Sequence, residues 1–179
     1  MNKLRIHLCA GLMLAPFAAL AGEPCQIQLD QPHLDYGTLQ LPPGATMDRF
    51  SQAHALEPRY VRLRVFCGQP APLAMVLAGA SQDGQLKFAT SGHVRLQLQD
   101  ASVDGLPVAL ASQNTTSPAQ QTLEVRPGQR ILPFRAGIPV EGSDWSMSLK
   151  IMPSLPLGEL RSRDQTPVEA TLTLQLADQ

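Results

Sequence analysis

Short segments in which apolar and polar residues alternate recur along this chain, and they constrain its fold more than any other feature. In Tyr60–Cys67, for example, every second side chain is apolar and arginines stand between them. A strand repeats every two residues, so this alternation predicts strands with one buried and one exposed face. No stretch shows a sustained helical spacing of apolar residues, and 16 prolines would interrupt most candidate helices. The sequence therefore predicts an all-β protein.

The expected strands are separated by Pro, Gly, Asn and Asp residues, which favour turns. They cover residues 25–29, 36–41, 59–67, 73–78, 94–98, 106–110, 123–125, 131–134, 145–151 and 168–176. Strands at this spacing in one domain favour a two-sheet sandwich of immunoglobulin-like type over a barrel. No internal repeat and no linker divides residues 22–179, so we expect them to form one domain.

Residues 1–21 have the features of a secretory signal peptide. Lys3 and Arg5 precede an apolar run from Leu8 to Leu20, and the segment ends in the small-x-small cleavage pattern of residues 19–21. The apolar run is too short to span a bilayer, and no later stretch approaches the roughly 20 apolar residues that a spanning helix needs. We therefore expect a domain that is exported to the periplasm and beyond, with no membrane span.

Export determines what the cysteines can do. Cleavage after Ala21 removes Cys9 and leaves Cys25 and Cys67 in an oxidising compartment. Both cysteines lie on the apolar parity of their expected strands, so both side chains point toward the core. The sequence therefore predicts one disulfide, Cys25 to Cys67. The two thiols do not form a CxxC pair, which favours a structural bridge over a redox role.

The charge balance argues against polyanionic partners for the protein as a whole. The formal net charge is −1, and loss of Lys3 and Arg5 with the signal peptide makes the balance more acidic. Neither nucleic acid nor an anionic membrane surface is therefore an expected partner. Arg59, Arg62 and Arg64 cluster in the sequence, but alternate arginines on a strand usually form a solvated face.

The sequence also lacks the groups that an enzyme needs in one place. His33, His54 and His93 are far apart, and the pair His33-x-Asp35 has no further ligand at metal-site spacing. There is no GxSxG nucleophile elbow and no phosphate-binding glycine loop. Trp145 lies on the apolar parity of its strand, which favours core packing over a sugar platform. We expect no catalytic residues, no metal and no cofactor, and a function in binding or assembly.

Several motifs together resemble the pilin-domain family, the subunits of chaperone/usher fimbriae of Gram-negative bacteria. They are the early Cys25, the DYGTL segment at 35–39, the strand YVRLRVFC that ends in the partner cysteine, and the closing strand PVEATLTLQL at 167–176. The resemblance implies an incomplete immunoglobulin-like sandwich that lacks its last strand and exposes an apolar groove. In that family a periplasmic chaperone fills the groove first, and the N-terminal extension of a neighbouring subunit then replaces it.

Carried over to this chain, the resemblance makes the closing strand one wall of a strand-acceptor groove. The apolar residues at its alternate positions are Val168, Ala170, Leu172, Leu174 and Leu176. In strand addition, main-chain hydrogen bonds supply affinity and alternate apolar pockets supply specificity. The resemblance thus implies a structural subunit of a cell-surface fimbrium that contributes to adhesion. Its expected partners are a periplasmic pilus chaperone, an outer-membrane usher and a neighbouring pilus subunit.

Two features depart from the family pattern. Residues 174–179 read LQLADQ, whereas the family usually has an aromatic-containing strand there. After cleavage only Gly22–Pro24 would precede Cys25, too short a segment to serve as a donor strand, so we expect a minor subunit at the tip. The alternative is a self-contained β-sandwich, periplasmic or secreted, that binds a carbohydrate or a protein, with residues 168–176 in an ordinary complete core.

Overall fold

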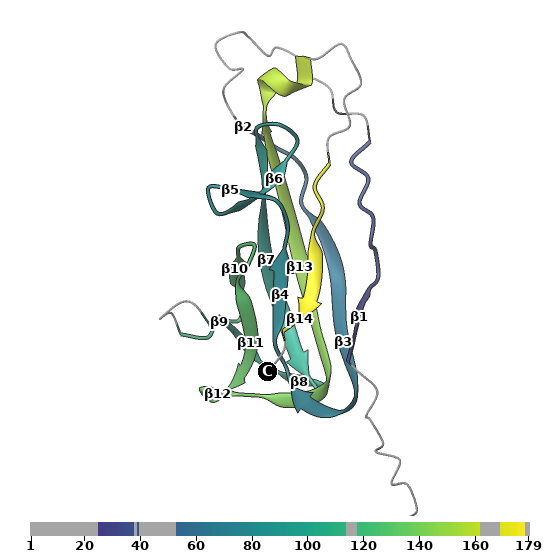
Figure 1. Cartoon of the computed structure of the whole chain (residues 1–179), viewed down its shortest axis with the longest axis vertical. Helices are drawn as coiled ribbons and strands as arrows, with labels where there is room; N and C mark the ends of the chain where they lie inside the picture. Colours follow the sequence, from purple (N-terminus) through teal and green to yellow (C-terminus); the bar gives the residue numbers. More distant parts are fainter. Residues whose placement is uncertain (1–24, 38, 40–52, 114–117, 162–168, 178–179) are drawn as a thin grey trace, which may run out of the picture.

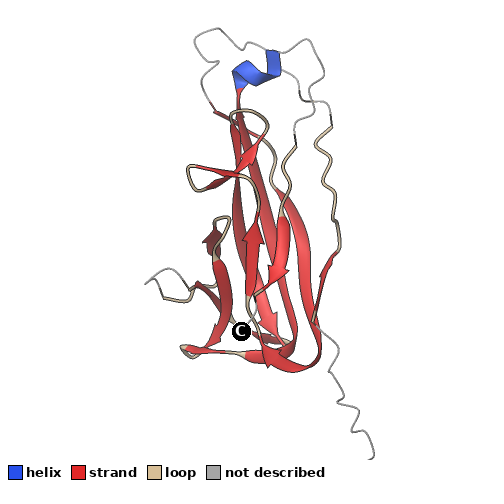
Figure 2. Ribbon diagram, viewed as in Figure 1, coloured by secondary structure: helices blue, strands red, loops and turns tan. Residues whose placement is uncertain are grey.

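The computed structural model describes residues 25–37, 39, 53–113, 118–161 and 169–177. The predicted signal peptide, Gly22–Pro24 and Val168 lie outside these ranges. Within them, strands dominate and run along the long axis of the molecule (Figure 2), and helical structure is limited to the 3-10 turn η2 (Leu157–Arg161). The prediction of an all-β protein is confirmed.

The strands form two antiparallel sheets. In sheet A the spatial order is β1 (Gln26–Leu29), β3 (Arg59–Pro72), β13 (Glu141–Pro156), β7 (Gly92–Val103), β6 (Gln85–Phe88) and β5 (Ser81–Gln82). Three short strands extend it: β2 (Ala53–Ala55) pairs with β13, while β8 (Leu106–Pro107) and β10 (Leu123–Val125) pair with β7. In sheet B the order is β12 (Ile138–Pro139), β11 (Arg130–Arg135), β4 (Met75–Ala78) and β14 (Thr173–Leu176), and β9 (Ala109–Ser112) pairs with β11.

The long strand β13 is the centre of sheet A, because it pairs with β3 on one side and with β7 on the other (Figure 1). Its register with β3 places Trp145 opposite Val65 and Leu149 opposite Val61. All four side chains are buried. The alternation seen in the sequence of β3 therefore continues across the sheet as rows of buried side chains.

The hydrophobic core lies between the two sheets. Sheet A contributes the fully buried Leu63 and Trp145, and sheet B contributes the equally buried Met75, Leu77 and Ile131 to the same cluster. Burial of a side chain of this size contributes about 1.5–3 kcal/mol, so the facing residues hold the sheets together. The core position predicted for Trp145 is confirmed.

The predicted disulfide between Cys25 and Cys67 is present. It joins the residue before β1 to the middle of β3, and Cys67 is buried as its parity predicts. The bridge links residues 42 positions apart. A loop of that length corresponds to about 4 kcal/mol in the chain-entropy model, which places the bridge among the larger single contributions to stability.

The strand expected at 36–41 is not formed by the described residues of that segment. Tyr36, Gly37 and Leu39 have no strand pairing. The Asp35 carboxylate instead accepts a hydrogen bond from the Gly37 amide at 2.7 Å, and Gly37 has φ of +66°. An Asx turn with a left-handed residue interrupts an extended backbone, which explains why the predicted strand is absent here.

Tyr36 is half-buried beneath Arg59, whose guanidinium lies 5.5 Å from the ring centroid.

Several other expected strands have different limits, and β3, β7 and β13 extend beyond the expected 59–67, 94–98 and 145–151. The segment expected at 106–110 is divided at the buried Val108, because β8 pairs with β7 in sheet A whereas β9 pairs with β11 in sheet B. The closing strand expected at 168–176 is shorter, since the described residues before Thr173 have no strand pairing. The short strands β2, β5, β6 and β12 were not predicted.

We expect the disulfide to make a large contribution to the stability of the fold. Replacing both Cys25 and Cys67 by serine should lower the free energy of unfolding by about 2–5 kcal/mol. Urea unfolding can be followed through Trp145, the single tryptophan, whose buried ring becomes hydrated on unfolding. Equal midpoints for the oxidised protein and the serine variant, or two free thiols by mass spectrometry, would contradict this expectation.

Candidate functional site

Strand β14 forms one edge of sheet B, and among the described residues it pairs only with β4. The Ala177 amide donates to the Ala74 carbonyl at 3.0 Å, directly opposite in the register of this pair. In an antiparallel ladder every second residue exchanges such bonds with its partner, and the residues between them direct their amide and carbonyl groups to the other side. Gln175 therefore bonds to β4, whereas Leu174 and Leu176 turn their backbone groups toward the outer edge.

Strand β1 forms the edge of sheet A in the same way. The Asp30 amide donates to the Arg62 carbonyl at 3.1 Å, so Asp30 and Gln28 belong to the hydrogen-bonded positions of the β1–β3 ladder. Ile27 and Leu29 lie between them and direct their backbone groups away from β3. Two strand edges of different sheets thus present backbone groups of apolar residues.

The two edges lie close to one another. Cα atoms of β1 and β14 approach within 8 Å, and Figure 1 shows both strands on the same side of the molecule. Four apolar side chains of this region pack against the core but remain half-exposed: Ile27, Leu172, Leu174 and Leu176. We call these side chains, together with the outer edges of β1 and β14, the open edge.

The structure brings together only part of the predicted groove wall. Leu172, Leu174 and Leu176 share one face of the closing segment and pack against the core. Ala170 is exposed in a segment without strand pairing, so it does not line the open edge as expected, and Val168 lies outside the described residues. Ile27 was not predicted as part of the wall, although its alternation with Gln26 and Gln28 carried the signal.

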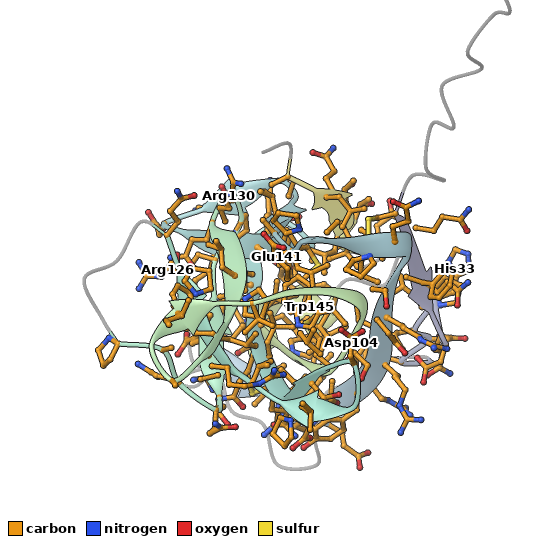
Figure 3. The ribbon with its side chains drawn as sticks, turned by 90° about the horizontal axis from the view of Figure 1, so that it is seen from below. His33, Asp104, Arg126, Arg130, Glu141 and Trp145 are labelled. Atoms are coloured by element: carbon orange, nitrogen blue, oxygen red, sulfur yellow. A yellow bond between two sulfur atoms is a disulfide. The ribbon has the colours of Figure 1, made fainter. Side chains whose placement is uncertain are left out.

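The histidines considered for a metal site are not brought together. His33 follows β1, His54 lies in β2 and His93 in β7. Figure 3 shows His33 at the β1 side of the molecule, well apart from Asp104 and Glu141. Among the described residues no group of three or more His, Cys, Asp or Glu side chains could hold a metal ion. In the same part of the chain, no helix is long and apolar enough to cross a membrane.

A polar cluster on the outer face of sheet A has a structural role. Asp104 accepts hydrogen bonds from the backbone amides of Ser143 and Asp144 at 3.1 and 3.0 Å, where the β3–β13 register shifts. This holds Asp144 so that its carboxylate accepts two hydrogen bonds from the Arg64 guanidinium, at 2.8 and 2.6 Å. The hydrogen bond from Arg64 lowers the pKa of Asp144 below its usual value. These hydrogen bonds fix the backbone of β13 at the bulge.

The end of the molecule seen in Figure 3 has a shallow depression lined by Pro72, Arg130 and Glu141 among others. Its lining mixes apolar residues with one cation and one carboxylate, without a convergent set of polar groups. The open edge is therefore the candidate functional site.

A scan against protein-family models, a search of curated proteins and a search of solved structures each found no match to this chain.

The open edge predicts a pattern of amide exchange within one short strand. In the isolated monomer the Leu174 and Leu176 amides should exchange about tenfold faster than the Gln175 amide, because only Gln175 is bonded to β4. Hydrogen exchange followed by NMR resolves these neighbours. Equal protection of Leu174 and Gln175 would mean that another segment covers the outer edge of β14.

The Arg64–Asp144 pair should contribute to stability in a pH-dependent way. Because the folded-state pKa of Asp144 lies below its unfolded value, the contribution is present at neutral pH and is lost as pH falls through the lowered pKa. Arg64→Ala should raise the pKa of Asp144 toward its usual value, as measured by NMR titration of the carboxyl carbon. Arg62→Ala removes a nearby charge without this hydrogen bond and should leave the pKa almost unchanged.

Proposed function

We propose that this protein is a structural subunit of a chaperone/usher-assembled pilus, completed by an added β-strand at the open edge, and that its fold is an immunoglobulin-like sandwich without its last strand. The observation that carries the proposal is the juxtaposition of two strand edges, β1 and β14, that no described residue pairs with, beside half-covered core residues.

The strand order supports the proposed fold. An immunoglobulin sandwich has strands A, B, E and D in one sheet and C, F and G in the other. Here β1, β3, β13 and β7 follow the order A-B-E-D, and β4 and β14 correspond to C and F in both sheet position and chain order. The place of strand G, beside F, is the outer edge of β14, which no described residue occupies. The remaining strands are additions at β7, at the end of β13 and at the far side of β4.

The chemistry of the open edge suits a strand as its ligand. Outward backbone groups of Leu174 and Leu176 offer hydrogen bonds in the plane of sheet B, and those of Ile27 offer them at the facing edge. The half-buried leucines provide apolar contacts at a spacing of two residues, which an alternating strand matches. An uncovered apolar edge promotes aggregation, so a chaperone that occupies it before assembly would solve a physical problem of this fold.

Neighbouring side chains of β14 point to different surroundings, one toward the open edge and the next toward solvent. Leu174 packs against the core and Gln175 is exposed. An aspartate at 174 would place a charge in the apolar contact, whereas an aspartate at 175 would remain in water. The two substitutions therefore form a matched pair with the same change of charge.

Strand complementation tests the proposal directly. A variant that carries an alternating apolar strand, joined after Gln179 by a flexible Gly/Ser linker, should be monomeric and should melt about 10 °C higher than the uncomplemented protein, since several apolar side chains become buried. Leu174→Asp should remove most of this gain and Gln175→Asp should retain it.

The control extension replaces the apolar residues of the added strand with serine and should have no effect. A protein that is a stable, cooperatively folding monomer alone, and that gains nothing from the apolar strand, would exclude strand complementation. That result would favour a self-contained β-sandwich that binds a carbohydrate or protein.

A further inference from the structure

Basic residues cross the outer face of sheet A on a diagonal line. Arg62 of β3 lies opposite Ser148, two residues from Lys150 of β13. Lys150 lies opposite Gln97, two residues from Arg95 of β7. In turn, Arg95 is two residues from His93, which pairs with Lys87 of β6. Each basic residue is thus the diagonal neighbour of the next at about 7–8 Å, and the line is roughly 20 Å long.

All of these side chains point to solvent. Arg62 stands between the buried Val61 and Leu63, and Arg95 and Lys87 likewise have buried neighbours on both sides in sequence. Lys150 is half-buried, and its ammonium lies 5.8 Å from the centroid of the Tyr60 ring. We call Arg62, Lys150, Arg95 and Lys87 the basic diagonal.

The basic diagonal is not neutralised within the described part of the chain. None of its members forms an ion pair there. Two carboxylates lie in its rows: Glu124 is opposite Gln97, and Asp30 accepts a hydrogen bond from the Arg62 backbone amide at 2.8 Å. The four cations therefore outnumber the carboxylates beside them. Arg64 differs, since its charge is paired with Asp144. A chain of formal net charge −1 therefore concentrates unpaired positive charge on one sheet face, which attracts a ligand of opposite charge.

The groups between the cations indicate what kind of anion fits. Ser148, Gln97 and Gln99 lie in the same rows and present hydroxyl and carboxamide groups that can bond to hydroxyls. Tyr60 is 52% exposed and offers an aromatic face beside Lys150. A protein interface normally has an apolar centre, and a single-stranded nucleic acid needs successive stacking platforms. Neither arrangement occurs along the basic diagonal.

We propose that the basic diagonal binds a linear anionic polysaccharide. Its carboxylate or sulfate groups pair with Arg62, Lys150, Arg95 and Lys87, and its hydroxyls bond to the intervening Ser and Gln side chains. The site lies on β3, β13, β7 and β6 and uses neither edge strand, so it is independent of strand addition at β1 and β14.

Binding can be measured by isothermal titration calorimetry with the protein exported to the periplasm of an expression host. The probes are an oligogalacturonate for carboxylates, a heparin oligosaccharide for sulfates, and neutral dextran. We expect at least one anionic probe to bind, dextran not to bind, and the affinity to fall about tenfold between low and physiological salt. Arg62→Ala and Arg95→Ala should each weaken binding about fivefold to tenfold.

The matched control is Arg59→Ala. Arg59 begins the same strand but has the opposite parity and lies over Tyr36, so its loss should change affinity less than twofold. Thermal midpoints of the alanine variants establish that each remains folded. No binding of either anionic probe, an equal loss with Arg59→Ala, or tighter binding to oligo-dT or polyglutamate than to both oligosaccharides would overturn the proposal.

Discussion

The antiparallel ladder between β3 and β13 is the constraint on which the rest of the structure depends. It pairs Arg59 with Ile151 at one end and Pro72 with Glu141 at the other, so it runs the whole length of β3 and most of β13. The ladder fixes which residues of β3 face the core, and hence the position of Cys67. It also sets the register of β7, which pairs with the other side of β13. A slip of one residue would turn every buried side chain of β3 to solvent.

The edges of the two sheets lack this reinforcement. β1 and β14 each have four residues and pair on one side only within the described chain. β1 is held close to the core by the disulfide beside it, and β14 is held by β4. The stable centre and the short edges fit a fold in which an added strand can be exchanged without loss of the remaining structure. Such exchange needs a scaffold whose stability resides elsewhere, and the β3–β13 ladder with its disulfide supplies one.

Local periodicity explains which parts could be predicted from the sequence. β3, β13 and β14 alternate over enough residues to be recognised, and the parity of Cys25 and Cys67 was sufficient to pair them. The strand expected at 36–41 is not formed at Tyr36, Gly37 and Leu39, where the Gly37 amide donates a hydrogen bond to the Asp35 carboxylate instead of joining a ladder. The open edge could not be derived, because it depends on which strand ends lie together in space. Arg59 was grouped with Arg62 and Arg64 by proximity in sequence, although its parity directs it to Tyr36 instead.

Successive side chains of a β-strand point to opposite faces, so the two faces of one strand can serve different purposes. In β3 the residues Val61, Leu63 and Val65 pack into the core, while Tyr60, Arg62 and Arg64 face outward. The inner set is constrained by burial in the core, where loss of a few methylenes already costs kilocalories per mole. The outer set has no such constraint, so an unpaired arginine at 62 is not required by the fold. Packing of the core therefore does not explain why Arg62 is aligned with Lys150, Arg95 and Lys87 across four strands. The explanation we propose is a ligand that spans those strands.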